Sequence, residues 1–157
     1  MPETTFPNPF KPMIDWVNTT FHNEFDWWNK LVGGVTNVTS FVNQTTHTIT
    51  IWKVDEKPWQ PANQIITIQP NRTVNQEFWI PWAKNQDEYV KHHMVIKVDG
   101  RDYAYAFQNG NKLYASTHDR FDSNAGEFPG LSMAGGSRKM VFTNMNNGEL
   151  AFALLPV

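Results

Sequence analysis

Five histidines are the side chains best suited to chemistry in this chain, but their spacing argues against a shared site. His92 and His93 are adjacent, and adjacent side chains on a strand point to opposite faces of the sheet. They therefore cannot bind one metal ion together. His22, His47 and His118 stand alone, without the closely spaced second ligand that zinc sites show. We expect no bound metal ion and no cofactor.

Ser116, His118 and Asp119 have the residue types of a nucleophilic triad. Three residues so close at one strand end cannot place the acid behind the imidazole and the serine in front of it. The chain also lacks cysteine and a G-x-S-x-G motif, which excludes a thiol nucleophile and the serine turn of α/β-hydrolases. We therefore predict no catalytic residue and favour a binding protein over an enzyme.

Two tryptophans adjoin prolines in segments that we expect to be loops. Trp59 lies in KPWQP and Trp82 in IPW. An exposed indole on a stiff loop can stack on a sugar or enter a membrane interface, because one end of the ring is apolar and the other is polar. The alternative is that each ring folds back and closes the end of a β-sandwich.

The segment 118–138 is long for a loop and rich in acids and glycines, and loops of this length are usually functional or disordered. Its carboxylate and amide oxygens could accept hydrogen bonds from sugar hydroxyls, and its arginine could bind an anionic group. The same oxygens could hold Ca²⁺, but they lack the ordered spacing of an EF-hand, and a solvated loop is the alternative. The predicted ligand-binding residues are Trp59, Trp82, Asp119, Asp122, Asn124 and Arg138.

A single helix is expected near the N-terminus. Residues 1–12 contain four prolines and should form an extended arm. Apolar residues then recur at spacings of three and four, which predicts a helix over 13–32, ended by Gly33 and Gly34. Its polar face carries more acidic than basic residues, so an anionic membrane would repel it and we expect it to pack on the protein's own sheet. The apolar stripe consists of Ile14, Val17, Phe21, Phe25, Trp28 and Leu31.

The chain from residue 35 onward is predicted to form strands and turns, because β-branched and aromatic residues dominate and alternate with polar ones. Asp99-Gly100, Asn109-Gly110 and Asn147-Gly148 each match a two-residue hairpin turn. The first turn predicts that Ile96 faces Tyr103 and Met94 faces Tyr105 in the core, with Lys97 and Asp102 outside. The other two predict Tyr105 opposite Tyr114 and Val141 opposite Leu154.

These elements predict an all-β fold. Residues 13–157 should form a single β-rich domain, an antiparallel β-sandwich or squat barrel of eight to nine short strands with the amphipathic helix packed on it. The C-terminal hairpin is apolar on both faces, which places it in the middle of the fold between a facing sheet and the helix.

Charge limits the partners. Thirteen Lys and Arg against fifteen Asp and Glu give a net charge of -2, without a polybasic run, so nucleic acid is not an expected partner. No window is apolar for the ~20 residues of a transmembrane helix, and residues 1–12 lack the features of a signal peptide, so we expect cytoplasmic synthesis. Self-association into a homo-oligomer stays open.

The layout of an amphipathic helix followed by a cysteine-free, aromatic-rich β-domain resembles small pore-forming cytolysins and related lectins at the level of architecture. The leading hypothesis is a non-enzymatic module that recognises carbohydrate or a lipid headgroup through loop aromatics and polar side chains. One alternative is a membrane-active, cytolysin-like protein. The other is a small cyclase or isomerase with an aromatic cavity lined by Tyr103, Tyr105, Phe107 and Tyr114.

Overall fold

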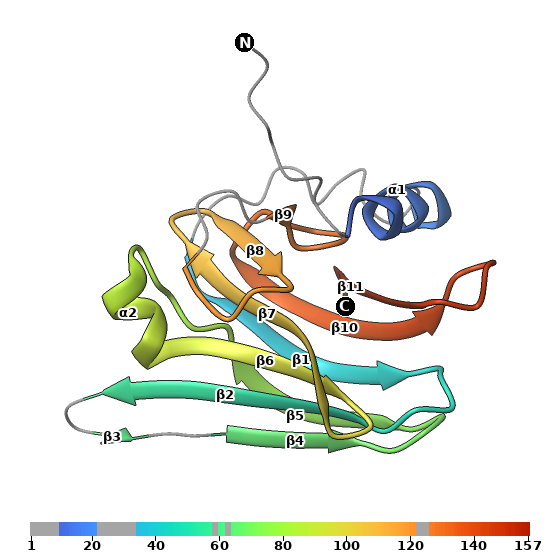
Figure 1. The fold of residues 1–157 in the computed structure, drawn as a ribbon, viewed down its shortest axis with the longest axis horizontal. Helices are drawn as coiled ribbons and strands as arrows, with labels where there is room; N and C mark the ends of the chain where they lie inside the picture. The colour runs from blue at the N-terminus through green and yellow to red at the C-terminus, as the bar shows by residue number, and fades with distance from the viewer. Residues whose placement is uncertain (1–9, 22–33, 58–59, 62–63, 122–125) are drawn as a thin grey trace, which may run out of the picture.

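The structure is a computed structural model that describes residues 10–21, 34–57, 60–61, 64–121 and 126–157. Two β-sheets pack on each other, with one helix near the N-terminus and a short helix in the middle of the chain (Figure 1). This confirms the predicted all-β sandwich with an N-terminal helix. The helices are α1 (Lys11–Thr20) and α2 (Gln86–Lys91).

The strands divide into a smaller and a larger sheet. The four-stranded sheet has the order β11 (Leu150–Pro156), β10 (Gly136–Asn144), β1 (Thr36–Asn43) and β5 (Thr73–Trp79). The other sheet has the order β3 (Gln60–Pro61), β2 (Ile49–Lys57), β6 (His92–Val98), β7 (Arg101–Asn109), β8 (Lys112–Ser116) and β9 (Gly126–Glu127), with β4 (Gln64–Ile68) also paired to β2. The pairs are antiparallel except for β1 and β10, which run parallel.

The core lies between the two sheets. On the larger sheet, residues two apart share a face, and Ile49, Ile51, Met94 and Ile96 are fully buried on the inner one. Burial of each such side chain contributes about 1.5–3 kcal/mol. The facing sheet contributes four buried phenylalanines to the same core. They are Phe41, Phe78, Phe142 and Phe152.

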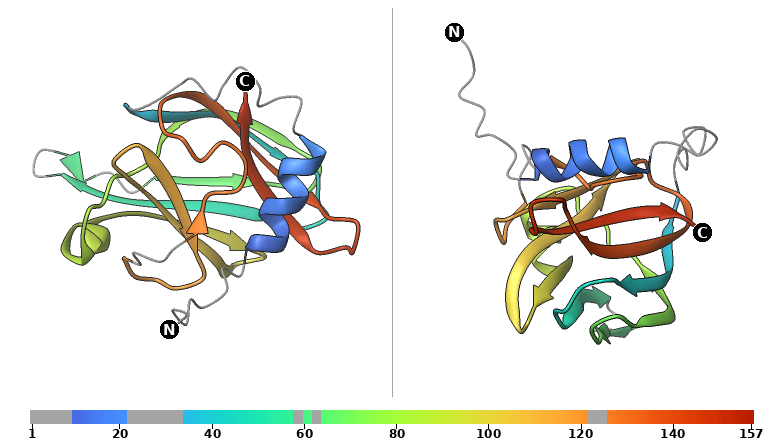
Figure 2. Two further views of the ribbon diagram at one scale, coloured as in Figure 1. Left: turned by 90° about the horizontal axis from the view of Figure 1, so that it is seen from above. Right: turned by 90° about the vertical axis from the view of Figure 1, so that its right-hand side faces the viewer.

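Helix α1 lies beside β11 and packs into the core (Figure 2). Val17 is buried, as the predicted stripe requires, whereas Ile14 and Phe21 are only partly buried. Met13, which the predicted stripe did not include, is buried as well. The helix begins at Lys11, two residues earlier than predicted, because a proline is tolerated in the first turn. It ends at Thr20, well before residue 32: threonines have low helix propensity, and the Thr19 hydroxyl bonds to the Asp15 carbonyl. Phe25, Trp28 and Leu31 lie outside the described residues.

Strand β11 is buried on both faces, as predicted, and α1 packs against it. In the strand order it is the end strand of its sheet. Its outer edge is covered by other parts of the chain. The Phe152 N–H donates to Sδ of Met13 at 3.4 Å, the Leu154 N–H donates to the Pro129 carbonyl at 3.0 Å, and the Leu131 N–H donates to the Leu154 carbonyl at 2.9 Å. Covering an edge in this way prevents pairing with another chain.

The predicted register at Asp99-Gly100 is correct at the turn and wrong beyond it. Lys97 pairs with Asp102, but a β-bulge follows, so that Ile96 pairs with Ala104 and not with Tyr103. Alanines 104 and 106 therefore fill the crowded inner face. Tyr103 instead donates a hydrogen bond to the Leu150 carbonyl at 3.2 Å, and Tyr105 pairs with Val95 on the outer face.

The other two hairpin registers also differ from the prediction. The middle turn is Gly110-Asn111, with φ +60° at Gly110, so Phe107 and not Tyr105 lies opposite Tyr114. A glycine in the first central position suits a type II′ turn. The last hairpin has a three-residue loop, residues 146–148, in place of a two-residue turn, and the Met145 N–H donates to the Glu149 carbonyl across it. This shifts Val141 from Leu154 to Ala153.

Candidate functional site

The inner face of the larger sheet changes from apolar to charged at one end of the sandwich. On β2 the buried Ile49 and Ile51 are followed, on the same face, by Lys53 and Asp55, which are only 8% and 7% exposed. On β6 the buried Met94 is preceded by His92 in the same way. Charged side chains are rarely buried without partners, so this end of the sandwich marks a candidate site.

Asp55 is held by two basic side chains. Nδ1 of His92 lies 2.8 Å from its Oδ1, and Nζ of Lys53 lies 3.6 Å from its Oδ2. The ladder brings His92 and Asp55 together, because they are directly paired residues of β6 and β2. Nζ of Lys53 also lies 5.1 Å from the centre of the Phe78 ring, which is close enough for a cation–π interaction.

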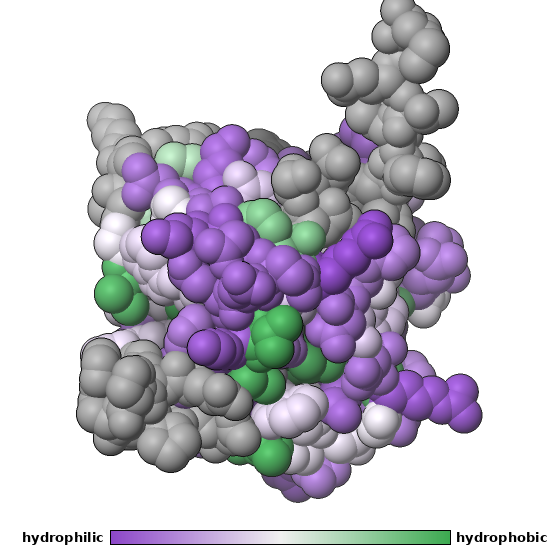
Figure 3. Space-filling view, turned by 60° about the vertical axis from the view of Figure 1, so that its left-hand side comes forward, coloured by the Kyte–Doolittle hydropathy of each residue, from purple (hydrophilic) through white to green (hydrophobic). Residues whose placement is uncertain are grey.

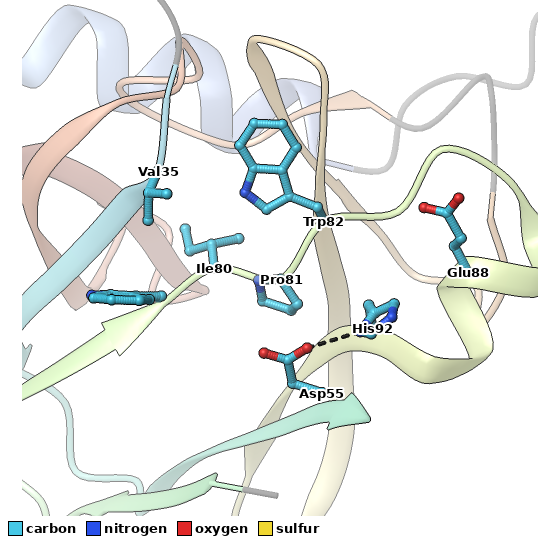
Figure 4. Close-up of a pocket in the computed structure, with 8 residues that line it drawn as sticks. Val35, Asp55, Ile80, Pro81, Trp82, Glu88 and His92 are labelled. Atoms are coloured by element: carbon cyan, nitrogen blue, oxygen red, sulfur yellow. Dashed lines mark hydrogen bonds and ion pairs between the residues drawn. The ribbon is translucent and has the colours of Figure 1, made fainter. Parts of the chain in front are cut away.

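A pocket of about 390 Å³ opens above Asp55 and His92 (Figure 4). Two indoles line it, Trp79 at the end of β5 and Trp82 three residues later, and they are 52% and 43% exposed. Glu88 completes the polar part of the lining. The other lining residues that the structure describes are Val35, Ile80 and Pro81. In a space-filling view of the side that carries α2, a few hydrophobic side chains appear among hydrophilic ones (Figure 3).

The segment that carries Trp82 is fixed to both sheets. The Ile80 N–H donates to the Thr36 carbonyl at 3.0 Å, which continues the pairing of the smaller sheet. The Gln108 N–H donates to the Pro81 carbonyl at 2.8 Å, and the Ala83 N–H donates to the Gln108 carbonyl at 2.9 Å, which joins the segment to β7. The backbone on either side of Trp82 is therefore held in place before any ligand arrives.

Buried hydrogen bonds support this junction. The side chain of Gln108 accepts from the Thr36 hydroxyl at 3.2 Å and donates to the carbonyls of Gly34 and Gly110, both at 3.0 Å. The Thr36 hydroxyl in turn accepts from the Gly135 N–H at 2.9 Å. Satisfied buried polar groups of this kind fix a single arrangement, because breaking any one of them leaves another unpaired.

Helix α2 places Glu88 at the pocket and leads directly into β6. Its N-cap, Asn85, accepts a hydrogen bond from the Glu88 N–H at 2.9 Å. The helix ends at Lys91, and the extended backbone of β6 then sends His92 to the pocket and His93 to the opposite face. The adjacent histidines therefore do point to opposite sides.

On the outer face of the sheet, His93 belongs to an aromatic cluster. Its ring stacks on Tyr89, with 4.4 Å between ring centres, and the Tyr89 hydroxyl donates to Oδ1 of Asp119 at 3.0 Å. Burial and the neighbouring Asp119 raise the pKa of Tyr89 above its ordinary range. Phe107 packs edge-to-face on Tyr89 and stacks on Tyr114. These rings contact one another, so we interpret the cluster as part of the packed interior and not as a ligand site.

The structure separates the residues that the sequence predicts as one binding surface. Trp82 lines the pocket, whereas Trp59, Asp122 and Asn124 lie outside the described residues. Asp119 belongs to the outer aromatic cluster. Arg138 is 1% exposed and is therefore not placed to meet a ligand at the surface.

The buried guanidinium of Arg138 donates hydrogen bonds to the loop before β10 and to the start of β10 itself. It donates to the carbonyls of Met133 at 3.0 Å and Ser137 at 3.3 Å. Burial lowers the pKa of Arg138 to about 10, because the charged form is poorly solvated there.

The four aromatic residues predicted to line an enzyme cavity do not line this pocket. Tyr103 packs on the main core, and Tyr105, Phe107 and Tyr114 belong to the outer cluster. Conversely, the sequence prediction missed Trp79, Asp55, Glu88 and His92 as one site. The missed signal was the change from isoleucine to lysine and aspartate at alternate positions of HTITIWKVD.

Within the described ranges, no group of three or more histidine, aspartate or glutamate side chains is placed to hold a metal ion. The same part of the chain contains no helix with the length and apolar character needed to cross a membrane. Searches of family models, curated proteins and solved structures found no match to this chain.

Proposed function

We propose that this protein binds carbohydrate in the Trp79–Trp82 pocket. The observation that supports the proposal most is the combination of two half-exposed indoles with a buried carboxylate, Asp55, whose position is fixed by His92 and Lys53. Of the ligand-binding residues predicted from the sequence, Trp82 lines this pocket.

The chemistry of the lining suits a sugar. One face of a pyranose presents C–H groups, which pack on an indole, while the hydroxyls around the ring need hydrogen-bond partners. Asp55 and Glu88 supply carboxylate oxygens, which accept hydrogen bonds from hydroxyls, and such charge-assisted bonds are stronger than neutral ones. The volume of about 390 Å³ lies within the usual range of small-ligand sites.

The fixed backbone on either side of Trp82 favours binding. A ligand that enters a preformed site loses less free energy to the ordering of the protein. The hydrogen bonds of Pro81 and Ala83 to Gln108, together with the buried Gln108 side chain, supply this order.

The test is a glycan array followed by calorimetry on the best ligand. Trp79→Ala and Trp82→Ala should each weaken binding by about 1–3 kcal/mol, as truncation of an aromatic anchor usually does, with little change in melting temperature. The matched control is Ile65→Ala on β4, because Ile65 is 62% exposed and does not line the pocket. The control variant should bind as the wild type does.

A lipid headgroup is the competing ligand, because exposed tryptophans also enter membrane interfaces. Flotation with phosphatidylcholine vesicles, and with vesicles that also contain phosphatidylserine, separates the two. Tryptophan-dependent flotation without any glycan ligand would contradict the carbohydrate proposal.

A further inference from the structure

We infer that the pocket selects sugars that carry a protonated amine, such as glucosamine units, over N-acetylated, neutral and acidic sugars. This inference rests on the proposed function and concerns the identity of the ligand. It is carried by the charges of the lining. Among the lining residues that the structure describes, Asp55 and Glu88 are the carboxylates, His92 is the third ionisable group, and none is a lysine or arginine.

The two carboxylates differ in how far their charge is already balanced. Asp55 is 7% exposed and lies close to both His92 and Lys53. Lys53 contacts Asp55 and is not among the lining residues, so it compensates the charge of Asp55 from outside the pocket. Asp55 is therefore suited to accept hydrogen bonds from neutral hydroxyls.

Glu88 is better suited to bind a ligand ammonium. Its ion pair is with Lys84, at 3.8 Å, and the Lys84 side chain is 75% exposed. Exposed ion pairs of this kind contribute little, because water screens them and the long side chain must be ordered. A ligand ammonium can therefore take the place of Lys84 beside Glu88 at low cost.

The indoles add to the same selectivity. The face of an indole attracts cations through its electron density. The protein already shows this behaviour elsewhere, since Nζ of Lys97 lies 5.3 Å from the centre of the Trp52 ring. In the pocket, Glu88 and His92 come from the α2–β6 side and Trp82 from the segment after β5, so an amino sugar that stacks on the indole can direct its ammonium toward Glu88 (Figure 4).

The test is calorimetry with four tetrasaccharides, composed of glucosamine, N-acetylglucosamine, glucose or galacturonic acid, at mildly acidic pH. The wild type should bind the glucosamine form roughly tenfold more tightly than the N-acetylated form, because a hydrogen bond between an ammonium and a carboxylate joins two opposite charges, whereas the amide of the N-acetylated form is neutral. Glu88→Gln should bring this ratio close to one, because it should weaken binding of the glucosamine form much more than binding of the glucose form. Glutamine preserves the shape of the side chain and is equally acceptable at the third position of a helix.

The control is Glu149→Gln, in the exposed loop between β10 and β11, which should keep the wild-type ratio. A wild-type ratio near one, or a ratio that Glu88→Gln leaves unchanged, would overturn the inference. If Trp79→Ala and Trp82→Ala still lower the affinity for every sugar in that case, the proposal of carbohydrate binding stands and only the preference for an amine fails. If none of the four sugars binds, the inference fails, and the glycan array decides on carbohydrate binding.

Discussion

Asp55 and His92 face each other at directly paired positions of β2 and β6, with 2.8 Å between Oδ1 of Asp55 and Nδ1 of His92. Both residues line a pocket that is also lined by two half-exposed indoles. Lys53 contacts the same carboxylate, and the side chains of Lys53 and Asp55 are each only 10% exposed. Asp55 therefore combines a structural ion pair with a position in the lining of the pocket.

Asp55→Asn should lower the free energy of unfolding by about 2–4 kcal/mol, because removal of one charge from a buried pair leaves the other poorly compensated. Urea denaturation measures the loss. Lys53→Met in the same background should recover part of it, since the buried charge is then absent. If the double variant loses as much unfolding free energy as the single variants Asp55→Asn and Lys53→Met lose when added together, Lys53 and Asp55 are not coupled.

Asp99 should make stability depend on pH at the tip of the β6–β7 hairpin. Its carboxylate lies 2.6 Å from Nδ1 of His47 and accepts from the Thr48 N–H, and these hydrogen bonds lower the pKa of Asp99. A lowered pKa stabilises the fold above the ordinary pKa of the group, and the contribution is lost as the pH falls through the folded pKa.

Asp99→Asn should therefore be less stable than the wild type at neutral pH and equally stable in acid below the pKa of Asp99. Asparagine tolerates the φ of +51° at this position and keeps an oxygen for Thr48, so the substitution removes mainly the charge. Chemical denaturation at several acidic pH values measures the free energy of unfolding of the wild type and of Asp99→Asn as a function of pH. A gap that stays constant at every pH would contradict this prediction.

Gly130 should not tolerate a side chain. It has φ +90°, and a Cβ atom there would clash with the carbonyl oxygen of Leu154, which is part of the covered edge of β11. Gly130→Ala should cost more than Gly148→Ala, where φ is +85° but no atom lies within 4 Å of the added Cβ. The second substitution should cost about 1–2 kcal/mol for the left-handed conformation alone. Equal melting temperatures of the two variants would show that the edge adjusts.

Val17→Asp should separate α1 from the core, because Val17 is fully buried and an unpaired charge cannot remain there. Asn18→Asp, on the exposed side of the same helix, is the matched control and should be nearly neutral. Circular dichroism and thermal denaturation report the difference. Leakage of liposomes by the wild type would instead support the cytolysin-like alternative, in which α1 leaves the sheet.

The fold class was predictable because alternation and hairpin turns are local signals, whereas the bulge after Lys97 was not. The sequence around Asp99-Gly100 permits Ile96 to face Tyr103, and only the crowded inner face explains why alanines 104 and 106 occupy it. The sequence predicted only Trp82 of the site, because the site, like the bulge, depends on contacts between distant parts of the chain. Its other residues, Asp55, Glu88 and His92, come from β2, α2 and β6, and the pairing of those elements decides that they meet.

The parallel pair of β1 and β10 has a consequence for biosynthesis. Thr36 pairs with Gly136, so β1 leaves the ribosome long before its partner is translated. The hairpins from β6 to β8 join neighbours in sequence and can form earlier, since closing short loops costs less entropy. A nascent chain arrested before Gly136 should therefore protect β6–β8 from protease and leave the β10-side edge of β1 unpaired, although β5 on its other side is already translated. Until translation reaches β10, that edge of β1 is open to chaperones or to another nascent chain.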